Sequence, residues 1–162
     1  MKKFLFLIIA ASLLVFSSCD TLNTKDTLNE TAVLKSGHMV TTFKAHLTGS
    51  QEVAPVETMA TGEAIFKLSK DGTMLSYKVI VANIENVTAS HIHMAPVGVN
   101  GGVVVPLYIG GLIEGKTNGI LAEGVVPIDQ SLVDAMMAGN TYVNVHTTAH
   151  PGGELRGQIS AN

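Results

Sequence analysis

Residues 90–94, SHIHM, and residues 142–147, YVNVHT, each show the alternation of side chains that is typical of a β-strand. Successive side chains of a strand point to opposite faces, so His91 and His93 are expected on one face, with Cα atoms roughly 6.5–7 Å apart. By the same rule, His146 lies on the face opposite to the two valines of its strand. If the two strands are neighbours, three imidazoles could converge on one point.

The composition favours a turn-rich β protein. Of 162 residues, 16 are Gly, only 14% are charged and 5% are aromatic, so a core has to be built mainly from aliphatic side chains. The formal net charge of −3 provides no basic surface for nucleic acid, which is therefore not expected as a partner. Cys19 is the only cysteine, which leaves no pair for a disulfide within the chain.

Residues 1–18 are predicted to be a signal peptide. Two lysines precede an apolar run, residues 4–16, that is shorter than the ~20 residues of a membrane-spanning helix. Two serines and then Cys19 follow, which resembles the lipobox of bacterial lipoproteins, where cleavage occurs before a lipid-modified cysteine. We therefore expect lipidation of Cys19 and attachment to a membrane of the bacterial cell envelope, on its extracytoplasmic side. Ordinary secretion, with cleavage near Ser18, is the alternative.

The rest of the chain is predicted to be a tether and one domain. Residues 19–38 comprise Cys19 and a segment rich in Thr, Asn and Asp without periodicity, which is typical of a flexible tether. Residues 39–162 are predicted to fold as a single β domain.

Within this domain, apolar alternation predicts seven or eight short strands and one helix. The predicted strands lie at 38–47, 62–68, 73–82, 87–94, 103–109, 119–126, 142–146 and 155–160. Asp71-Gly72 is a strong hairpin signal, and Pro106 suggests an edge strand. The helix is expected near 129–138, with Asp129 as its N-cap. Its apolar side is predicted to comprise Leu132, Met136 and Met137. This pattern favours an antiparallel β-sandwich or a Greek-key barrel.

Three separated blocks resemble successive parts of a known domain. They are LTGSQEVAPVET, GEAIFKLSKDGTMLSYKVIVANIENVTASHIHMAPVGVNGGVVVPL and AGNTYVNVHTTAHPGGELRGQI, and together they span about Thr41 to Ile159. They are similar to the CHRD (chordin) domain family, which occurs in the extracellular antagonist chordin and in many bacterial secreted proteins. The resemblance implies a β-sandwich in an extracytoplasmic setting, but little about activity. Growth-factor binding is not expected, because the single domain lacks the cysteine-rich modules of chordin.

His91, His93 and His146 are the candidate metal ligands. A His-x-His pair on a strand presents two imidazoles to zinc or copper, at about 2.0–2.1 Å for zinc. His146 would complete a three-histidine site with an open position. The alternative is a polar strand face, on which these histidines bond to neighbouring backbone or carboxylate groups and hold no metal.

A second polar group comprises Glu52, Glu154 and Arg156. The guanidinium fork of arginine suits bidentate pairing with a carboxylate. We expect a structural network in which an ion pair or hydrogen bonds hold the loop before Pro55 against the last strand. A receptor for an anion or a substrate carboxylate is the alternative.

Two functions from different classes remain. The favoured one is a lipid-anchored cell-envelope protein whose CHRD domain is a non-enzymatic binding or structural module for an extracytoplasmic protein or a small ligand. The alternative is a zinc- or copper-dependent enzyme, or a metal-binding protein, that uses His91, His93 and His146. No nucleophile or general base is evident beside these histidines, so no catalytic residue is assigned.

Overall fold

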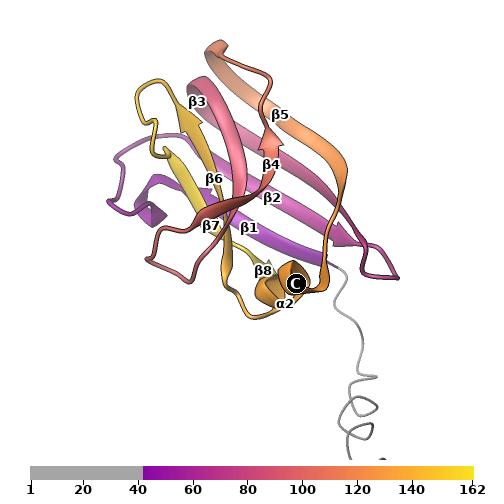
Figure 1. Cartoon of the computed structure of the whole chain (residues 1–162). Coiled ribbons are helices and arrows are strands. Elements are labelled where there is room, and N and C mark those ends of the chain that lie inside the picture. The colour runs from indigo at the N-terminus through magenta and orange to yellow at the C-terminus, as the bar shows by residue number, and fades with distance from the viewer. Residues whose placement is uncertain (1–41) are drawn as a thin grey trace, which may run out of the picture. The chain divides into compact units, whose positions relative to one another are not determined.

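Eight strands and one α-helix form within residues 42–162, the part of the chain that the computed structural model describes (Figure 1). In chain order the elements are β1 (Thr42–Thr48), the short 3-10 helix η1 (Gly49–Gln51), β2 (Thr61–Leu68), β3 (Met74–Met94), β4 (Gly102–Tyr108), β5 (Ile113–Pro127), α2 (Gln130–Met137), β6 (Thr141–Thr147), β7 (Leu155–Gln158) and β8 (Ser160–Ala161). The predicted signal peptide, Cys19 and the tether lie outside the described residues. Within residues 42–162, no helix has the length and apolar character to cross a membrane.

Five strands close into a barrel. Neighbouring strands follow the order β2, β1, β7, β6 and β3, and a further pairing between β2 and β3 joins the two ends. Both β4 and β5 extend the sheet by pairing with β3, and β8 pairs with β1. Closure leaves fewer unpaired backbone groups than an open sheet would expose. The predicted all-β class with one short helix is confirmed, in the form of a closed barrel with additional strands.

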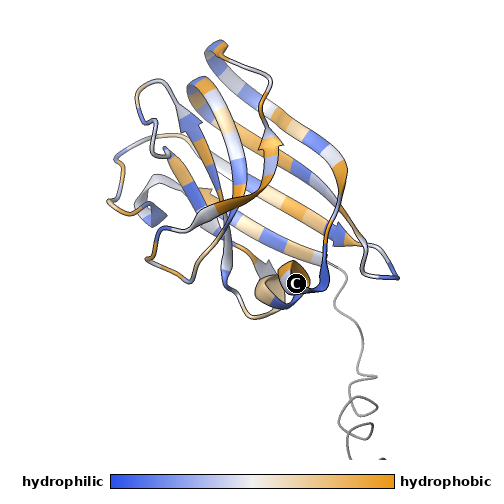
Figure 2. Cartoon of the chain, in the orientation of Figure 1, coloured by the Kyte–Doolittle hydropathy of each residue, from blue (hydrophilic) through white to orange (hydrophobic). Residues whose placement is uncertain are grey.

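The core follows from the alternation of side chains. On β1, Phe43, Ala45 and Leu47 are buried, and on β2, Ala64 and Phe66 are buried, while their sequence neighbours point outward. Figure 2 shows this as alternating hydrophobic and hydrophilic bands along the strands. Full burial of a large apolar side chain contributes about 1.5–3 kcal/mol. The alternating strands therefore place the core inside the barrel and leave polar side chains on the opposite face.

The two predicted strands 73–82 and 87–94 are in fact one strand, β3. Asn83 and Asn86 interrupt its pattern with φ angles of 58° and 53°, and the register with β5 shifts around them. Asparagine tolerates this left-handed conformation, and such bulges bend a strand without ending it. The first half of β3 can thus pair with β2 and β5, and the second half with β6 and β4.

The predicted strand 119–126 is too short, because β5 begins at Ile113. Gly115 and Gly119 have φ angles of 75° and 106°, and the intervening residues are charged or polar. Such a segment has no alternation, and only its pairing with β3 makes it a strand. The edge position predicted for β4 from Pro106 is confirmed, since β4 lies at the end of the strand order.

The helix α2 begins as predicted. The Asp129 carboxylate accepts a hydrogen bond from the Leu132 N–H at 2.9 Å, which satisfies one of the unpaired donors of the first turn. Leu132 and Met136 are buried as predicted, but Met137 is 49% exposed, and Val133 is buried instead. Adjacent helical residues are turned by about 100° from each other, so Met137 points away from the side that Met136 buries.

Candidate metal centre

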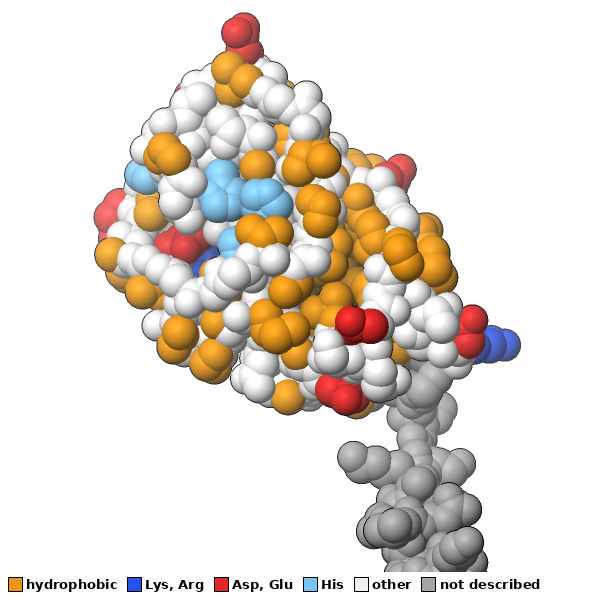
Figure 3. All heavy atoms as spheres, viewed as in Figure 1, with side chains coloured by type: hydrophobic (Ala, Val, Ile, Leu, Met, Phe, Trp, Pro, Cys, Tyr) orange, Lys and Arg blue, Asp and Glu red, His pale blue; other side chains and the backbone are white. Residues whose placement is uncertain are grey.

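The pairing of β3 with β6 brings the three candidate histidines together. In the antiparallel register, Ala89 lies opposite His146 and His91 lies opposite Asn144, so His146 is the diagonal neighbour of His91. The ring centroids of His91 are 5.1 Å from His146 and 5.7 Å from His93. One nitrogen from each of the three rings can be chosen so that all three atoms lie within 4.8 Å of one another. Figure 3 shows histidine side chains side by side at the surface, with apolar side chains around them.

Two backbone carbonyls assign the protons of His93 and His146. Nδ1 of His93 lies 2.9 Å from the Gly101 oxygen, and Nδ1 of His146 lies 2.9 Å from the Pro151 oxygen. A carbonyl only accepts, so both Nδ1 atoms carry hydrogen, and in the neutral rings both Nε2 atoms carry the lone pair. Nε2 of His93 is buried and has no hydrogen-bond partner. A backbone carbonyl that accepts from one ring nitrogen commonly orients a metal-binding imidazole, whose other nitrogen then binds the metal through its lone pair.

His91 provides the third nitrogen. Its Nδ1 lies 3.2 Å from Nε2 of His146, and because that Nε2 carries a lone pair, Nδ1 of His91 is the donor of a hydrogen bond between the two rings. To bind an ion through Nδ1, His91 has to carry its proton on Nε2 instead. Ligands of tetrahedral zinc, with Zn–N near 2.0–2.1 Å, are themselves about 3.3–3.4 Å apart. This pair therefore has the spacing of two zinc ligands. The widest separation in the cluster, at most 4.8 Å, has to close by up to about 1.4 Å.

The surroundings favour neutral imidazoles. Burial, together with His146 and His93, holds the pKa of His91 below its usual value. Burial also lowers the pKa of His146, against the opposing effect of the Pro151 carbonyl. His93 is 8% exposed. Neutral imidazole is the form that binds metal, so burial favours the ligand form of His91 and His146.

Glu52, Glu154 and Arg156, the second predicted polar group, are all buried, but they do not bond to one another. Among residues 42–162, Arg156 makes no ion pair within 4 Å with Glu52 or Glu154. Glu154 instead accepts hydrogen bonds from the hydroxyls of Thr58 and Thr147, at 2.7 and 2.8 Å. These bonds attach the loop after η1 and the end of β6 to one buried carboxylate.

Glu52 lies beside the turn that precedes β7. A Cβ at Gly153 would overlap the Glu52 carboxylate and come within 3.0 Å of the Asn144 side-chain nitrogen. Oε1 of Glu52 and Oδ1 of Asn144 are buried without a hydrogen-bond partner. Burial raises the pKa of Glu52, while the charge of Arg156 and the Val53 N–H oppose the shift. A protonated Glu52 carboxyl can donate a hydrogen bond, which an ionised one cannot.

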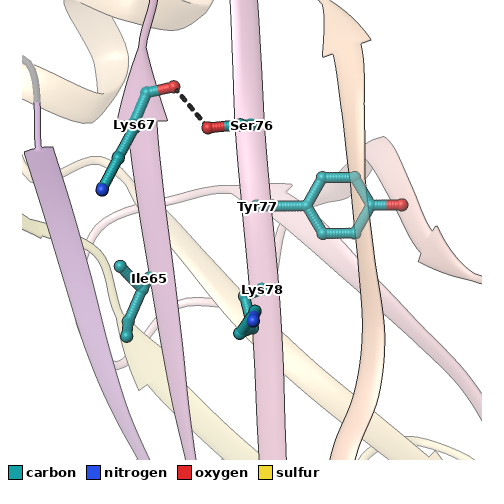
Figure 4. A pocket seen from close by; sticks show the side chains of 5 residues that line it. All are labelled: Ile65, Lys67, Ser76, Tyr77 and Lys78. Carbon is teal, nitrogen blue, oxygen red and sulfur yellow. Dashed lines mark hydrogen bonds between the residues drawn. The ribbon is translucent and has the colours of Figure 1, made fainter.

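A different kind of surface lies on the outward side of β2 and β3. A shallow hollow of about 330 Å³ is lined there by Ile65, Lys67, Ser76, Tyr77 and Lys78. In Figure 4, Tyr77 points away from the others, and the Ser76 hydroxyl donates to the Lys67 carbonyl at 3.2 Å. The lining contains amines, hydroxyls and apolar groups but no imidazole or carboxylate, so it offers no set of metal ligands.

Sequence reasoning identified the three rings but missed what orients them. The carbonyls of Gly101 and Pro151 are backbone atoms in loops, and no residue type marks them. Tyr142 stacks on His93. The sequence pattern predicted only that this tyrosine lies on a strand, and nothing in it indicated a contact with His93. Its register opposite His93 could not be inferred without the pairing of β3 and β6.

The fold and the site together define a class, an all-β barrel protein with a cluster of three histidines on the sheet face opposite to the core. The family model of the CHRD domain matches residues 43–159. The chain therefore belongs to the CHRD domain family, as the resemblance predicted. No curated protein and no solved structure matches the chain with significance.

Proposed function

We propose that this CHRD-domain protein is anchored in the cell envelope through lipid on Cys19 and binds one zinc or copper ion. The ligands would be Nδ1 of His91 and the Nε2 atoms of His93 and His146, three residues that each place one nitrogen within 4.8 Å of the others. A fourth position would remain open to water or to a group from another molecule, as in three-histidine sites generally.

The observation that carries the proposal is that one ring nitrogen of His93 is buried without a hydrogen-bond partner. Its Nε2 atom is buried and unpartnered, although its Nδ1 atom is held by the Gly101 carbonyl. An unpaired buried polar atom costs about 1–3 kcal/mol. The non-metal interpretation, in which these histidines merely bond to neighbouring groups, leaves this atom unsatisfied. A bound cation would use its lone pair together with those of the other two rings.

The surroundings support binding rather than catalysis. The hydrogen bonds described for the three rings go to each other and to two backbone carbonyls, and none of them reaches a carboxylate or a nucleophile. Acid–base chemistry at a metal-bound water needs a group within about 2.6–3.2 Å that can take up the proton. The chemistry of the ligands suits both metals, and divalent copper is expected to bind more tightly than zinc.

Elemental analysis and metal titration test the metal. The mature protein is purified in detergent without a polyhistidine tag, and we expect one zinc or copper ion per chain. His93→Ala should abolish binding. His46→Ala is the matched control, because His46 pairs with Glu63 on another part of the sheet and should leave binding unchanged. A wild-type protein that ignores both metals at micromolar concentration would contradict the proposal.

Fatty-acid labelling tests the anchor. Cys19→Ala removes the thiol that is proposed to carry the lipid. It should therefore abolish incorporation of labelled fatty acid and release the domain from the membrane fraction, because the acyl chains provide the attachment. Ser18→Ala retains a small residue before the cysteine and is the control that should still be labelled. Labelled fatty acid on the Cys19→Ala protein would show that the lipobox interpretation is wrong.

A further inference from the structure

His93 belongs to a column of three stacked side chains. Its ring is nearly parallel to that of Tyr142, with centroids 4.8 Å apart and planes inclined by 10°. Cζ of Arg156 lies 3.5 Å from the centroid of the same tyrosine ring. An imidazole and a guanidinium cannot share one face of a ring at these distances, so Tyr142 is held between them. Tyr142 thereby fixes the plane of the His93 ring, and Arg156 in turn holds Tyr142 in place.

Tyr142 also reaches His93 by a second route, through the backbone of Gly101. The Gly101 N–H donates a hydrogen bond to the Tyr142 hydroxyl at 3.2 Å, and the Gly101 oxygen accepts one from Nδ1 of His93 at 2.9 Å. A Cβ at Gly101 would overlap the backbone of Met94, so the loop turns back here in a way that only glycine permits. The tyrosine hydroxyl thus holds the backbone N–H of the residue whose carbonyl selects the proton position on His93.

Arg156 holds the remainder of the same loop. Its guanidinium donates hydrogen bonds to the Asn100 side-chain oxygen at 3.1 Å, to the Val99 oxygen at 2.9 Å and to the Pro96 oxygen at 3.3 Å. The side chain is 1% exposed, so these bonds are shielded from water. The loop that supplies the Gly101 carbonyl is therefore attached to the barrel at both the tyrosine and the arginine.

We infer that Tyr142 is a positioning residue for the metal centre, an inference that rests on the proposed metal binding. Through its hydroxyl and the backbone of Gly101, it keeps the proton of His93 on Nδ1 and leaves Nε2 free to bind the ion. Without a fixed acceptor at Nδ1, a neutral imidazole can carry its proton on either nitrogen, and only one of the two forms presents Nε2 as a ligand. Tyr142 acts through His93 and does not touch the metal.

Tyr142→Phe tests this inference, because it retains the stacked ring and removes only the hydroxyl. We expect zinc and copper(II) to bind about 10–100-fold more weakly, as for other groups that orient metal ligands. Tyr108→Phe is the matched control, since the Tyr108 hydroxyl donates to the Gly111 oxygen away from the cluster. Both variants are prepared as the mature protein in detergent, and their melting temperatures without metal are compared first.

A second readout separates positioning from general stability. In metal-free protein, ¹⁵N NMR of the His93 ring should report hydrogen on Nδ1 in the wild type and in Tyr108→Phe, but a mixture of both forms in Tyr142→Phe. If Tyr142→Phe does not fold, Arg156→Lys, which loses the fork that holds the loop, is measured in its place. Wild-type affinity and an unchanged proton position in the folded variant would overturn the inference. If the wild type binds no metal, the proposed function fails, while the NMR comparison still decides whether Tyr142 sets the proton position.

Discussion

Arg156 on β7 and Lys78 on β3 are both cations that point away from the core, but they lie in different surroundings. Arg156 is 1% exposed and bonds to three oxygens of the loop that follows β3. The Lys78 side chain is 43% exposed, and its amine lies 3.0 Å from the Glu123 carboxylate. Loops cover the face that carries Arg156 and the histidines, which we call the histidine face. The outward side of β2 and β3, which carries Lys67 and Lys78, is the open face.

The difference shows where polar side chains determine structure. On the open face, water can replace any lost partner, so an exposed ion pair contributes little. On the histidine face, Arg156 and His93 are buried, and their polar atoms depend on the few partners that the loops supply. The histidine face can therefore hold imidazole rings in one orientation for a ligand, whereas side chains on the open face can be replaced at little cost in stability.

The largest effect is expected for Arg156→Met. Removal of the guanidinium leaves three loop oxygens without their donor and removes the contact with the Tyr142 ring. Each buried oxygen that is left without a donor typically costs about 1–3 kcal/mol in the free energy of unfolding, so the three together make this the largest expected loss. Urea denaturation followed by circular dichroism measures this cost. A loss of less than about 1 kcal/mol would mean that the histidine face tolerates change as the open face does.

A matched pair of glycines gives the next largest contrast. Gly153 has a φ of 130°, and a Cβ there would meet Glu52 and Asn144, whereas Gly72 has a φ of 74° in the β2–β3 hairpin with nothing within 4 Å. Gly72→Ala should cost about 1–2 kcal/mol from backbone conformation alone. Gly153→Ala should cost more, because it also displaces the buried carboxylate. Equal losses in thermal or urea denaturation would contradict the close packing of this turn.

Glu52→Gln should change how stability depends on pH. The raised pKa of Glu52 means that the folded protein retains a proton that the unfolded chain, with its usual value of 4.5, releases. The stability that this proton contributes is fully present below pH 4.5 and is lost as the pH rises through the raised pKa. Gln cannot titrate, so the variant should lack this part of the decline. Denaturation midpoints at several pH values provide the measurement, and identical profiles for both proteins would argue against the shift.

The smallest effect is expected for Lys78→Ala. Its ion pair with Glu123 is partly exposed on both sides. Such pairs contribute about 0–1 kcal/mol, and less at high salt. A double-mutant cycle with Glu123→Ala, in low and high salt, measures the coupling. A coupling that is large and insensitive to salt would show that the open face is less accessible to water than its exposure indicates.

Much of the barrel could be predicted because its signals are local. The strands β1 and β2 follow apolar alternation, Asp71-Gly72 forms the hairpin, and Asp129 caps the helix with its own carboxylate. The errors occurred where a local pattern is broken by distant pairing. Residues 113–118 have no alternation and become part of β5 only through β3, which also continues past Asn83 and Asn86.

For the candidate site, the sequence by itself determined that His91 and His93 share a face, because a strand fixes the direction of alternate side chains over a few residues. Only the tertiary structure decided that His146 joins them, because this depends on the register between β3 and β6, whose partners are 47 to 60 residues apart in the chain. The tertiary structure also placed the Gly101 and Pro151 carbonyls against two of the rings. Backbone atoms carry no residue-type signal, so their positions follow only from how the loops close over the barrel.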